Sequence, residues 1–219
     1  MNWDLIWSSF GPLITGAVTG TIPLTLASFA FGLVLALVVA LMRLSPNWLL
    51  SGIGRFYVSV IRGTPLLVQL FVIFFGLPSI GIRLDPWPSA IIAFSLNVGG
   101  YAAEIIRAAI LSVPKGQWEA GHTIGMSRPQ ALVRIILPQA ARVSVPPLSN
   151  TFISLVKDTS LASLILVTEL FRNAQQIAAF SQEFMALYLQ AALVYWVICL
   201  VLSTAQSAVE KRLDRYVAH

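Results

Sequence analysis

The sequence predicts an all-α integral membrane protein with five transmembrane helices, on the basis of its composition and the spacing of its charges. Of the 219 residues, 57% are hydrophobic and only 11% are charged, and the mean hydropathy is +0.81. Soluble domains carry about 25% charged residues, so this chain is too apolar to be surrounded by water. Long uncharged stretches recur along it, and about 20 such residues cross a bilayer core of about 30 Å as a helix.

The N-terminal region contains 38 uncharged residues between Asp4 and Arg43. As one helix they would reach about 57 Å at 1.5 Å per residue. That length is too great for one span and too small for two spans with a turn between them. We therefore expect an interfacial N-terminal piece, broken near Gly11-Pro12, followed by a first span at residues 20–42.

Charges and an interfacial tryptophan delimit the remaining spans. Twenty uncharged residues lie between Arg62 and Arg83, which is the length of one span. The next span begins near Trp87, because tryptophan is typical of membrane interfaces and the prolines beside it favour the first turn of a helix. No internal repeat marks a second domain, so residues 1–219 are predicted to form a single transmembrane domain. The four later spans are predicted at residues 63–82, 88–109, 147–167 and 184–209.

Basic residues are distributed unequally between the two sides of this predicted domain, with eleven on one side and two on the other. Cytoplasmic loops of membrane proteins carry such an excess, so we expect the N-terminus outside and the C-terminus in the cytoplasm. The formal net charge of +5 fits this bias better than it fits nucleic-acid binding. The eleven are Arg43, Arg55, Arg62, Arg107, Lys115, Arg128, Arg134, Arg142, Lys211, Arg212 and Arg215, and the two are Arg83 and Arg172.

A polar insert interrupts the apolar pattern at residues 114–138, on the side with the basic excess. We expect a first short helix over Lys115–Ile124 and a turn at Gly125, since glycine tolerates positive φ. Ser127 is a suitable N-cap for a second short helix, which we expect to end before Pro138. Two short helices joined at a glycine would form a compact knob for a partner. An amphipathic loop lying on the lipid surface is the alternative interpretation.

The polar insert resembles the EAA loop of type I ABC importer permeases. The family pattern is Glu-Ala-Ala, three residues, Gly, nine residues, Ile, one residue and Leu-Pro, and the chain departs from it only where Gly121 replaces the second Ala. The resemblance implies the type I ABC importer permease fold, with cytoplasmic coupling helices that sit in a cleft on a nucleotide-binding subunit. The residues implied in ATPase coupling are Glu119, Ala120, Gly121, Gly125, Ile135, Leu137 and Pro138.

Most of the chain, from about residue 20 to residue 210, is similar to the polar amino acid uptake permeases. The segments that carry this similarity are Arg62–Gln69, Ser95–Asn97, Tyr101–Glu104 and Leu155–Leu161. Three further segments resemble the cystine-uptake permeases in particular, namely Leu41–Pro46, Leu84–Pro86 and Lys115–Glu119. The resemblance implies the pathway-forming subunit of an ATP-driven importer of a polar amino acid, with L-cystine as the first choice of substrate.

The same resemblance implies the partners of the chain. One such chain encloses little space, so a second permease copy would complete the pathway. The resemblance favours a homodimer over a pair of different permeases. Two cytoplasmic ATP-binding subunits would hold ATP and Mg, and a periplasmic or lipid-tethered substrate-binding protein would deliver the amino acid. The implied location is the bacterial inner (plasma) membrane, with no nucleic-acid partner.

The chain lacks the sequence motifs of a catalyst. It contains no Gly-x-x-x-x-Gly-Lys-Ser/Thr phosphate-binding loop, no His-Glu-x-x-His and no Gly-x-Ser-x-Gly. His122 and His219 do not belong to any apparent metal cluster, and the single Cys199 cannot form an internal disulfide. We therefore expect no catalytic residue, no metal site and no cofactor on this chain, with ATP hydrolysed by a separate subunit.

Polar residues at membrane depth are the candidates for the substrate pathway, because a charge there costs roughly 2.5–3.5 kcal/mol on insertion scales unless it faces a cavity or a partner. The ammonium and carboxylate of an amino acid require acidic, basic and hydrogen-bonding neighbours. The candidates are Asn97, Glu104, Arg107, Asp158, Thr159 and Ser160, and the family resemblance implies substrate contact for Asn97, Arg107 and Asp158. Gln69 could also face the pathway.

Structural roles are the alternatives for these residues. Glu104 and Arg107 lie three residues apart and share a helix face, so they would form an ion pair near the cytoplasmic interface. Lys157 and Asp158 point about 100° apart and would hold neighbouring helices together. The sequence Asp158-Thr159-Ser160 could also unwind its helix locally, which membrane proteins tolerate only beside a cavity.

Three other functions remain compatible with parts of the sequence. The same machinery could import histidine, arginine, glutamine or an opine, since only a few pocket residues would differ. A secondary transporter or channel would explain the spans and the buried charges but would leave the polar insert without a purpose. A membrane enzyme is the least favoured, for want of a nucleophile or metal constellation.

Overall fold

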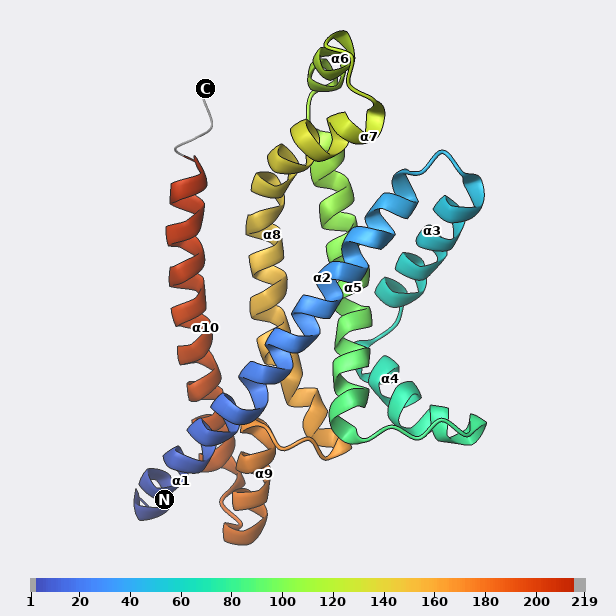
Figure 1. Cartoon of the computed structure of the whole chain (residues 1–219). Helices are drawn as coiled ribbons and strands as arrows, with labels where there is room; N and C mark the ends of the chain where they lie inside the picture. The colour runs from blue at the N-terminus through green and yellow to red at the C-terminus, as the bar shows by residue number, and fades with distance from the viewer. Residues whose placement is uncertain (1–2, 215–219) are drawn as a thin grey trace.

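The computed structural model describes residues 3–214 and is helical over nearly all of them. Figure 1 shows an elongated bundle in which α5 and α8 run along the long axis, α10 follows them, and α2 crosses obliquely. The predicted all-α architecture is confirmed for this part of the chain. Arg215 and His219 lie outside the described residues, so expectations about these two positions stay predictions.

The first helix is longer than predicted. A continuous run of 42 residues is formed by α1 (Trp3–Gly16), the π-helical turn η1 (Ala17–Thr21) and α2 (Ile22–Leu44). The break expected near Gly11-Pro12 is wrong, because Pro12 lies inside α1. Asn173 Nδ2, from another helix, donates to the Pro12 carbonyl at 2.8 Å. This bond links α1 to α9, but it does not replace the one that Pro12 lacks, which would go to the Ser8 carbonyl four residues earlier.

The second predicted span, residues 63–82, is not one helix. The segment before Thr64 is α3 (Trp48–Gly63), and the segment after it consists of α4 (Leu66–Phe71), the π turn η2 (Val72–Gly76) and the 3-10 turn η3 (Leu77–Ile80). The two segments meet at an angle of 105°. Pro65 explains the bend: it has no N–H with which to continue α3, and it disfavours helical backbone at Thr64, whose φ and ψ are −122° and 146°.

A single helix covers the third predicted span. It corresponds to α5 (Pro86–Ser112), which includes the whole of the predicted 88–109. Pro86 occupies the first turn of this helix, where its missing N–H leaves no hydrogen bond unmade. Ala and Gly residues such as Ala93, Gly99 and Gly100 are buried along α5, so α2 and α3 approach its backbone closely.

The fourth span begins earlier than the predicted residue 147. A single helical run is formed by α7 (Arg128–Ala131), the π turn η4 (Leu132–Ile136), α8 (Leu137–Asp158) and the 3-10 turn η5 (Thr159–Ile165). The expectation that a helix ends before Pro138 is also wrong. The N–H of Leu137 bonds to the Leu132 carbonyl, five residues back, and this wider turn precedes the proline ring. Pro146 and Pro147 lie inside α8.

Two helices complete the chain. The fifth predicted span, 184–209, lies within the single helix α10 (Phe184–Asp214). Before it lies α9 (Leu170–Ser181), which the sequence did not predict and which leaves the α7–η5 run at 48°. In Figure 1, α9 lies at the end of the bundle where α1 begins, opposite the polar insert.

Glu169 joins three of these helices at the end away from the insert. The side chain is fully buried and caps α9 by accepting the backbone N–H groups of Phe171 at 2.8 Å and Arg172 at 2.6 Å. It also accepts the hydroxyls of Tyr195 in α10, at 2.7 Å, and Thr21 in η1, at 3.4 Å. We refer to these five residues as the Glu169 junction.

The apolar core is divided between the bundle and its two ends. The largest cluster packs α2, α5 and α3 together around Phe94 and Leu24. A second cluster around Leu13 and Leu170 lies beside the Glu169 junction, and a third around Ile110 and Ile136 lies under the polar insert. Val98 and Leu155 of the first cluster also line the cavity described below.

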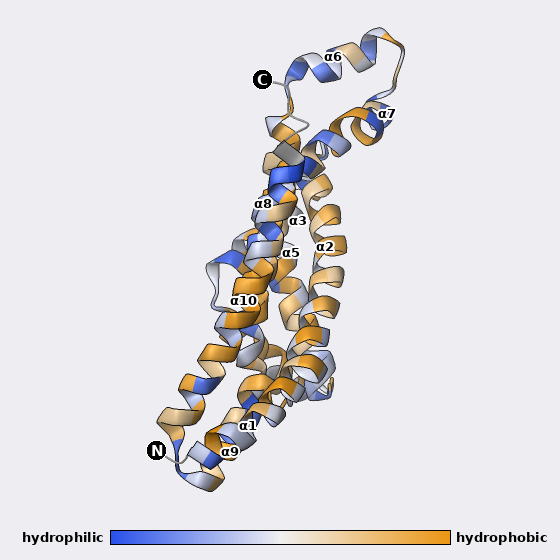
Figure 2. Cartoon of the chain, turned by 90° about the vertical axis from the view of Figure 1, so that its left-hand side faces the viewer, coloured by the Kyte–Doolittle hydropathy of each residue, from blue (hydrophilic) through white to orange (hydrophobic). Residues whose placement is uncertain are grey.

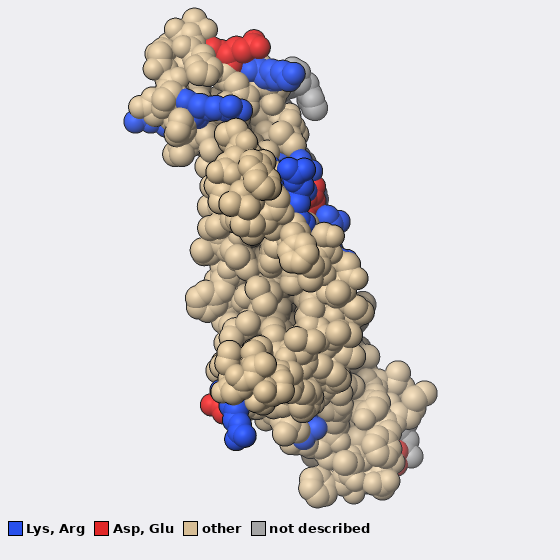
Figure 3. Space-filling view, turned by 90° about the vertical axis from the view of Figure 1, so that its right-hand side faces the viewer, with Lys and Arg blue, Asp and Glu red and all other residues tan. Residues whose placement is uncertain are grey.

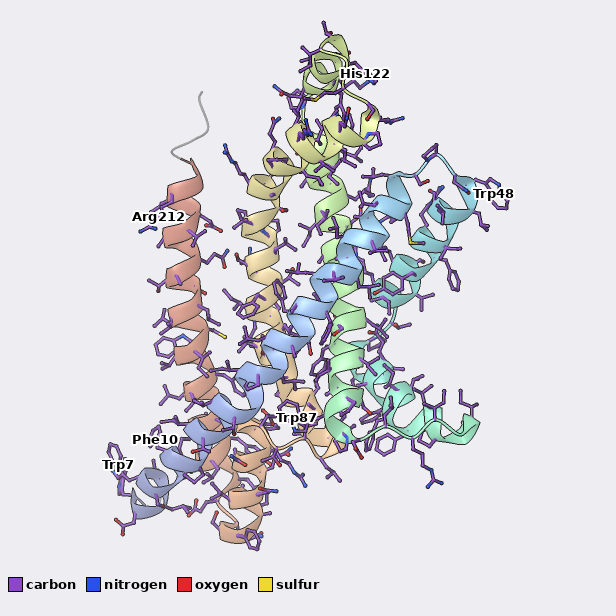
Figure 4. The ribbon with its side chains drawn as sticks, in the orientation of Figure 1. Trp7, Phe10, Trp48, Trp87, His122 and Arg212 are labelled. Atoms are coloured by element: carbon purple, nitrogen blue, oxygen red, sulfur yellow. The ribbon has the colours of Figure 1, made fainter. Side chains whose placement is uncertain are left out.

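The surface is consistent with a membrane domain. Figure 2 shows apolar residues along the middle of the bundle and hydrophilic ones on the insert. On the face drawn in Figure 3, most Lys and Arg side chains lie toward the insert end. Trp7 and Trp87 lie toward one end and Trp48 toward the other in Figure 4, as is typical of residues at the two membrane interfaces. Among residues 3–214, three helices could each cross a membrane, or five if each of the two bent pairs is one span.

Candidate functional site

A cavity of about 410 Å³ lies where the bend between α3 and α4 meets α5 and α8. Asn97 and Asp158, two of the predicted pathway residues, both line it. Asp158 is the single charged residue in its wall, and the other lining residues are a mixture of polar and apolar ones. The full lining consists of Thr64, Pro65, Leu66, Asn97, Val98, Tyr101, Asn150, Thr151, Ser154, Leu155 and Asp158.

Sequence reasoning missed most of the polar lining on α8. Asn150, Ser154 and Asp158 are spaced four residues apart, so they lie on one face of the helix and reach the same cavity. A polar stripe at this spacing within an apolar span was visible in the sequence, and it is the signal that could have identified Asn150 and Ser154.

The bend contributes the opposite wall of the cavity. Pro65 produces it, and the exposed backbone corner brings Thr64 and Leu66 to the cavity. Arg62, at the end of α3, lies with its guanidinium 5.4 Å from the ring centroid of Tyr101, a cavity residue on α5. This cation–π contact holds a positive charge beside the wall without placing it in the lining.

Glu104 and Arg107 do not line the cavity. Glu104 forms ion pairs with both Arg107 and Arg43, and its Oε1 accepts from Arg107 Nε at 3.1 Å. Since Arg43 is near the end of α2, this three-residue cluster ties α2 to α5 toward the insert end. The geometry fits the structural alternative considered for this pair.

Thr159 and Ser160 also stay outside the cavity lining. Both lie in η5, where the Thr159 hydroxyl donates to the Val156 carbonyl and the Ser160 hydroxyl to the Lys157 carbonyl, each at 2.7 Å. The α-helix tightens into a 3-10 turn directly after Asp158, so the helix departs from α geometry here but does not unwind. Within the described chain Lys157 and Asp158 form no ion pair, so their expected role in holding helices together lacks a contact here.

The polar insert has the predicted local structure from its first helix to the start of its second helix. Its first helix is α6 (Lys115–Thr123), and Gly125 follows with φ +80°. Ser127 begins α7 with a reciprocal capping box, in which its backbone N–H bonds to the Gln130 side chain at 2.9 Å. The insert projects from the bundle in Figure 1, and His122 lies near its tip in Figure 4.

Glu119 and Gly121 occupy opposite environments within α6. Glu119 is exposed and has no ion pair or hydrogen bond from its carboxylate in the part of the chain that the structure describes. Gly121 is buried, and a Cβ built on it would lie 3.2 Å from both Ala131 Cβ and Ile135 Cδ1. One face of α6 therefore packs on the rest of the insert, and Glu119 lies on the other face, which borders a groove between the insert and the ends of α2 and α5.

A groove of about 820 Å³ separates α6 and α7 from the ends of α2 and α5. Leu44, Ile110 and Trp118 are among the apolar residues that line it, and Arg128 lies 6.0 Å from the centroid of the Trp118 ring. The insert is thus attached to the bundle mainly through its later part, around Ile136.

Comparisons with known proteins identify the family. Residues 28–215 match the family model described as the binding-protein-dependent transport system inner membrane component. The chain is 62% identical to the L-cystine transport system permease protein TcyB of Bacillus subtilis, over 99% of this chain and 93% of that protein. It is 38% identical to the glutamine transport system permease protein GlnP of Escherichia coli, over 97% of each.

Solved structures agree with this result. A chain from the crystal structure of an amino acid ABC transporter with histidines superposes with a TM-score of 0.90 and 33% identity, over 97% of this chain and 99% of that one. A chain of the MetNI methionine ABC transporter in an inward-facing conformation has a TM-score of 0.79 at 20% identity, and so supports the fold alone. Members of the family are transport components that work with ATP-binding subunits and a substrate-binding protein. The chain therefore belongs to the inner-membrane components of binding-protein-dependent transport systems, and it is the permease subunit of an ABC importer.

Proposed function

We propose that this permease forms the translocation pathway for a polar amino acid, L-cystine first, and that the substrate passes through the cavity at Asn97 and Asp158. The main support for this proposal is the cavity itself, which combines one carboxylate with several hydrogen-bonding side chains at a break in a membrane helix. Irregular backbone at membrane depth is tolerated where it lines a pathway. The choice of L-cystine rests on the 62% identity to the Bacillus subtilis permease.

The chemistry of the cavity suits a zwitterionic amino acid. Asp158 accepts hydrogen bonds from an ammonium group, and Asn150 and Ser154 offer amide and hydroxyl donors to a carboxylate. A homodimer places two copies of this set about a two-fold axis. Cystine has two identical amino acid halves joined by a disulfide, so each half meets one Asp158. The second permease copy thus completes the wall of the pathway and supplies the residues that bind the second half of cystine.

The polar insert transmits the action of ATP in this mechanism. Two cytoplasmic ATP-binding subunits hold ATP and Mg, and each receives one insert through the exposed face of α6, including Glu119. ATP binding brings the ATPase subunits and the inserts together, and the spans open outward to a substrate-binding protein. Hydrolysis resets them inward. This arrangement requires the insert and the C-terminus in the cytoplasm and the N-terminus outside, the orientation that the basic residues favour.

The test is ATP hydrolysis and uptake by the reconstituted complex, with its ATP-binding and substrate-binding subunits, across a panel of amino acids. Stimulation by L-cystine above all others supports the full proposal. Stimulation chiefly by glutamine, the substrate named for the 38% identical relative, would keep the mechanism and replace the substrate. Uptake without coupled hydrolysis, with the subunits bound, would favour a secondary transporter or channel.

The Asp158→Asn variant tests the cavity within the same system. We expect about a tenfold loss or more in uptake, because a charged hydrogen bond to the ammonium is lost. Binding of the ATP-binding subunits should stay unchanged, since Asp158 is remote from the polar insert. Full uptake by this variant would remove the cavity from the pathway.

A further inference from the structure

Gln69 connects the bend between α3 and α4 to the cavity. Its side-chain Nε2 donates to the main-chain carbonyl of Ile61 at 2.8 Å and of Thr64 at 3.2 Å. A third bond, of 2.9 Å, goes to Thr64 Oγ1. Its other amide atom, Oε1, accepts from Asn97 Nδ2 at 3.1 Å. A half-buried residue outside the cavity lining thus bonds both the corner of the bend and a cavity residue.

These partners fix the direction of the Gln69 amide. Main-chain carbonyls accept hydrogen bonds and cannot donate them, so the two carbonyls require the NH₂ group of Gln69. The Thr64 hydroxyl already donates to the Val60 carbonyl at 2.8 Å, so toward Gln69 it too acts as an acceptor. The alternative orientation of the amide would place an oxygen against three acceptors. Gln69 therefore presents Oε1 to Asn97.

The direction of Asn97 follows from that of Gln69. Facing an acceptor, Asn97 must present its NH₂ group to Gln69, and its Oδ1 then points the other way. Oδ1 has no hydrogen-bond partner among residues 3–214, and Asn97 lines the cavity. The carbonyls at the end of α3 thus fix the Gln69 amide, and the Gln69 amide fixes Asn97 with its Oδ1 acceptor directed to the cavity.

We propose that Gln69 is a positioning residue for substrate recognition: it orients Asn97 so that the cavity offers two acceptors, Asn97 Oδ1 and the Asp158 carboxylate, to the ammonium group of the amino acid. This inference rests on the proposed function, because it assumes that substrate enters this cavity. It adds to the proposed function a residue outside the cavity lining, Gln69, and a defined orientation of the Asn97 amide. Without Gln69, the Asn97 amide is free to rotate and to offer N–H groups that repel an ammonium.

A double-mutant cycle separates this role from simple support of the bend. The variants are Gln69→Met, which keeps length and helix propensity but removes both polar groups, Asn97→Ala, and the two together. The quantity measured is kcat/KM for uptake of labelled L-cystine by proteoliposomes that contain the wild-type partner subunits, normalised to assembled complex. We expect about a tenfold loss in each single variant and no further loss in the double variant, because Gln69 acts through Asn97.

The matched control is Gln190→Met. Gln190 is also a buried glutamine that joins two helices, since it donates to the Ile6 carbonyl at 2.9 Å and accepts from Ser9 at 3.2 Å, but it lies in α10, away from the cavity. It should lose assembled complex and keep kcat/KM. An equal loss of kcat/KM in this control would overturn the inference, since the Gln69 effect would then be a general response to a lost helix contact.

Asn97→Asp keeps the test valid if Gln69→Met does not assemble. It retains an acceptor for the ammonium but sets a second acceptor against Gln69 Oε1, so we expect a loss similar to that of Asn97→Ala. Uptake at or above the wild-type level would overturn the inference. Independent, multiplying losses in the cycle would also overturn it while leaving the cavity in place. Normal uptake by Asn97→Ala would overturn the cavity assignment and the inference together.

Discussion

Glu169 and Glu119 are both acidic residues at short helices, at opposite ends of the molecule, and they differ in every contact. The Glu169 carboxylate is fully buried and accepts hydrogen bonds from two backbone N–H groups and two hydroxyls. The Glu119 carboxylate is exposed and finds no partner within residues 3–214. A buried acid with all its acceptors filled fixes the helices around it, whereas an exposed acid on a projecting helix is available to another subunit. The Glu169 junction should therefore govern stability, and the polar insert should govern coupling.

The largest effect on stability is expected from Glu169→Ala. The substitution uncaps α9, leaves two backbone N–H groups without their acceptor and removes the carboxylate that accepts from the half-buried Tyr195 hydroxyl. Each such group costs about 1–3 kcal/mol, so the free energy of unfolding should fall by about 3 kcal/mol or more. Thermal unfolding of the purified protein in detergent measures the loss. A melting temperature within error of the wild type would refute the assignment of the junction as the fixed region.

A smaller effect is expected at the turn of the polar insert. Gly125 has a φ of +80°, and no atom lies within 4 Å of a Cβ built on it, so Gly125→Ala is penalised by backbone strain alone. That strain amounts to about 1–2 kcal/mol. Because the insert projects from the bundle, the loss should appear as protease sensitivity between α6 and α7 and as reduced coupling of ATP hydrolysis to uptake. Gly116→Ala, also at an open position but without positive φ, is the control and should behave as the wild type.

These two positions show how far the sequence could predict the molecule. The turn at Gly125 and the cap at Ser127 were predicted because their causes are local: a glycine that tolerates positive φ, and a hydroxyl beside a helix start. The Glu169 junction could not be predicted in this way. Its partners Thr21 and Tyr195 are 148 and 26 residues away along the chain, so only tertiary packing brings them together.

Proline was the main source of error in the helix boundaries. Pro65 does break a helix, yet Pro12 and Pro147 lie inside one. The difference lies in the residue before each proline: Thr64 is extended, whereas Gly11 and Pro146 are helical, and a single sequence does not record which backbone is adopted. The predicted site residues likewise fall into two groups that the sequence alone does not separate. Asn97 and Asp158 reach one cavity, whereas Glu104 belongs to an ion-pair cluster that depends on Arg43, 61 residues earlier.

A still smaller effect on stability is expected from Glu119→Ala, the direct counterpart of Glu169→Ala. An exposed carboxylate without a partner contributes little to folding, so the free energy of unfolding should change by no more than about 0.5 kcal/mol. Uptake by the assembled importer should nevertheless fall about tenfold or more, because the ATP-binding subunit loses a charged contact that it covers. Parallel measurements of melting temperature and of substrate-stimulated ATP hydrolysis check both halves. If Glu119→Ala lowers the melting temperature but leaves coupling normal, Glu119 contributes to stability and not to coupling, and the contrast with Glu169 is wrong.

The smallest effect is expected at the position where the insert departs from the EAA pattern. Gly121→Ala restores the family residue, and its Cβ would lie 3.2 Å from Ala131 Cβ and Ile135 Cδ1. That spacing is tight, but Ile135 Cδ1 is the end of a flexible side chain and can shift by a few tenths of an ångström. Alanine also favours helix over glycine by about 0.5–1 kcal/mol, which offsets the remaining crowding. Melting temperature and coupled uptake should both match the wild type.

Gly121→Leu sharpens the same prediction, because its larger side chain cannot fit between α6 and the side chains of Ala131 and Ile135. It should push α6 away from α7 and lower coupled uptake while leaving the Glu169 junction, and hence the melting of the bundle, unchanged. Equal behaviour of the alanine and leucine variants would mean that α6 does not pack on α7 in the working importer. In that case the exposed face of α6, on which docking at Glu119 depends, would be defined by the ATP-binding subunit and not by the insert itself.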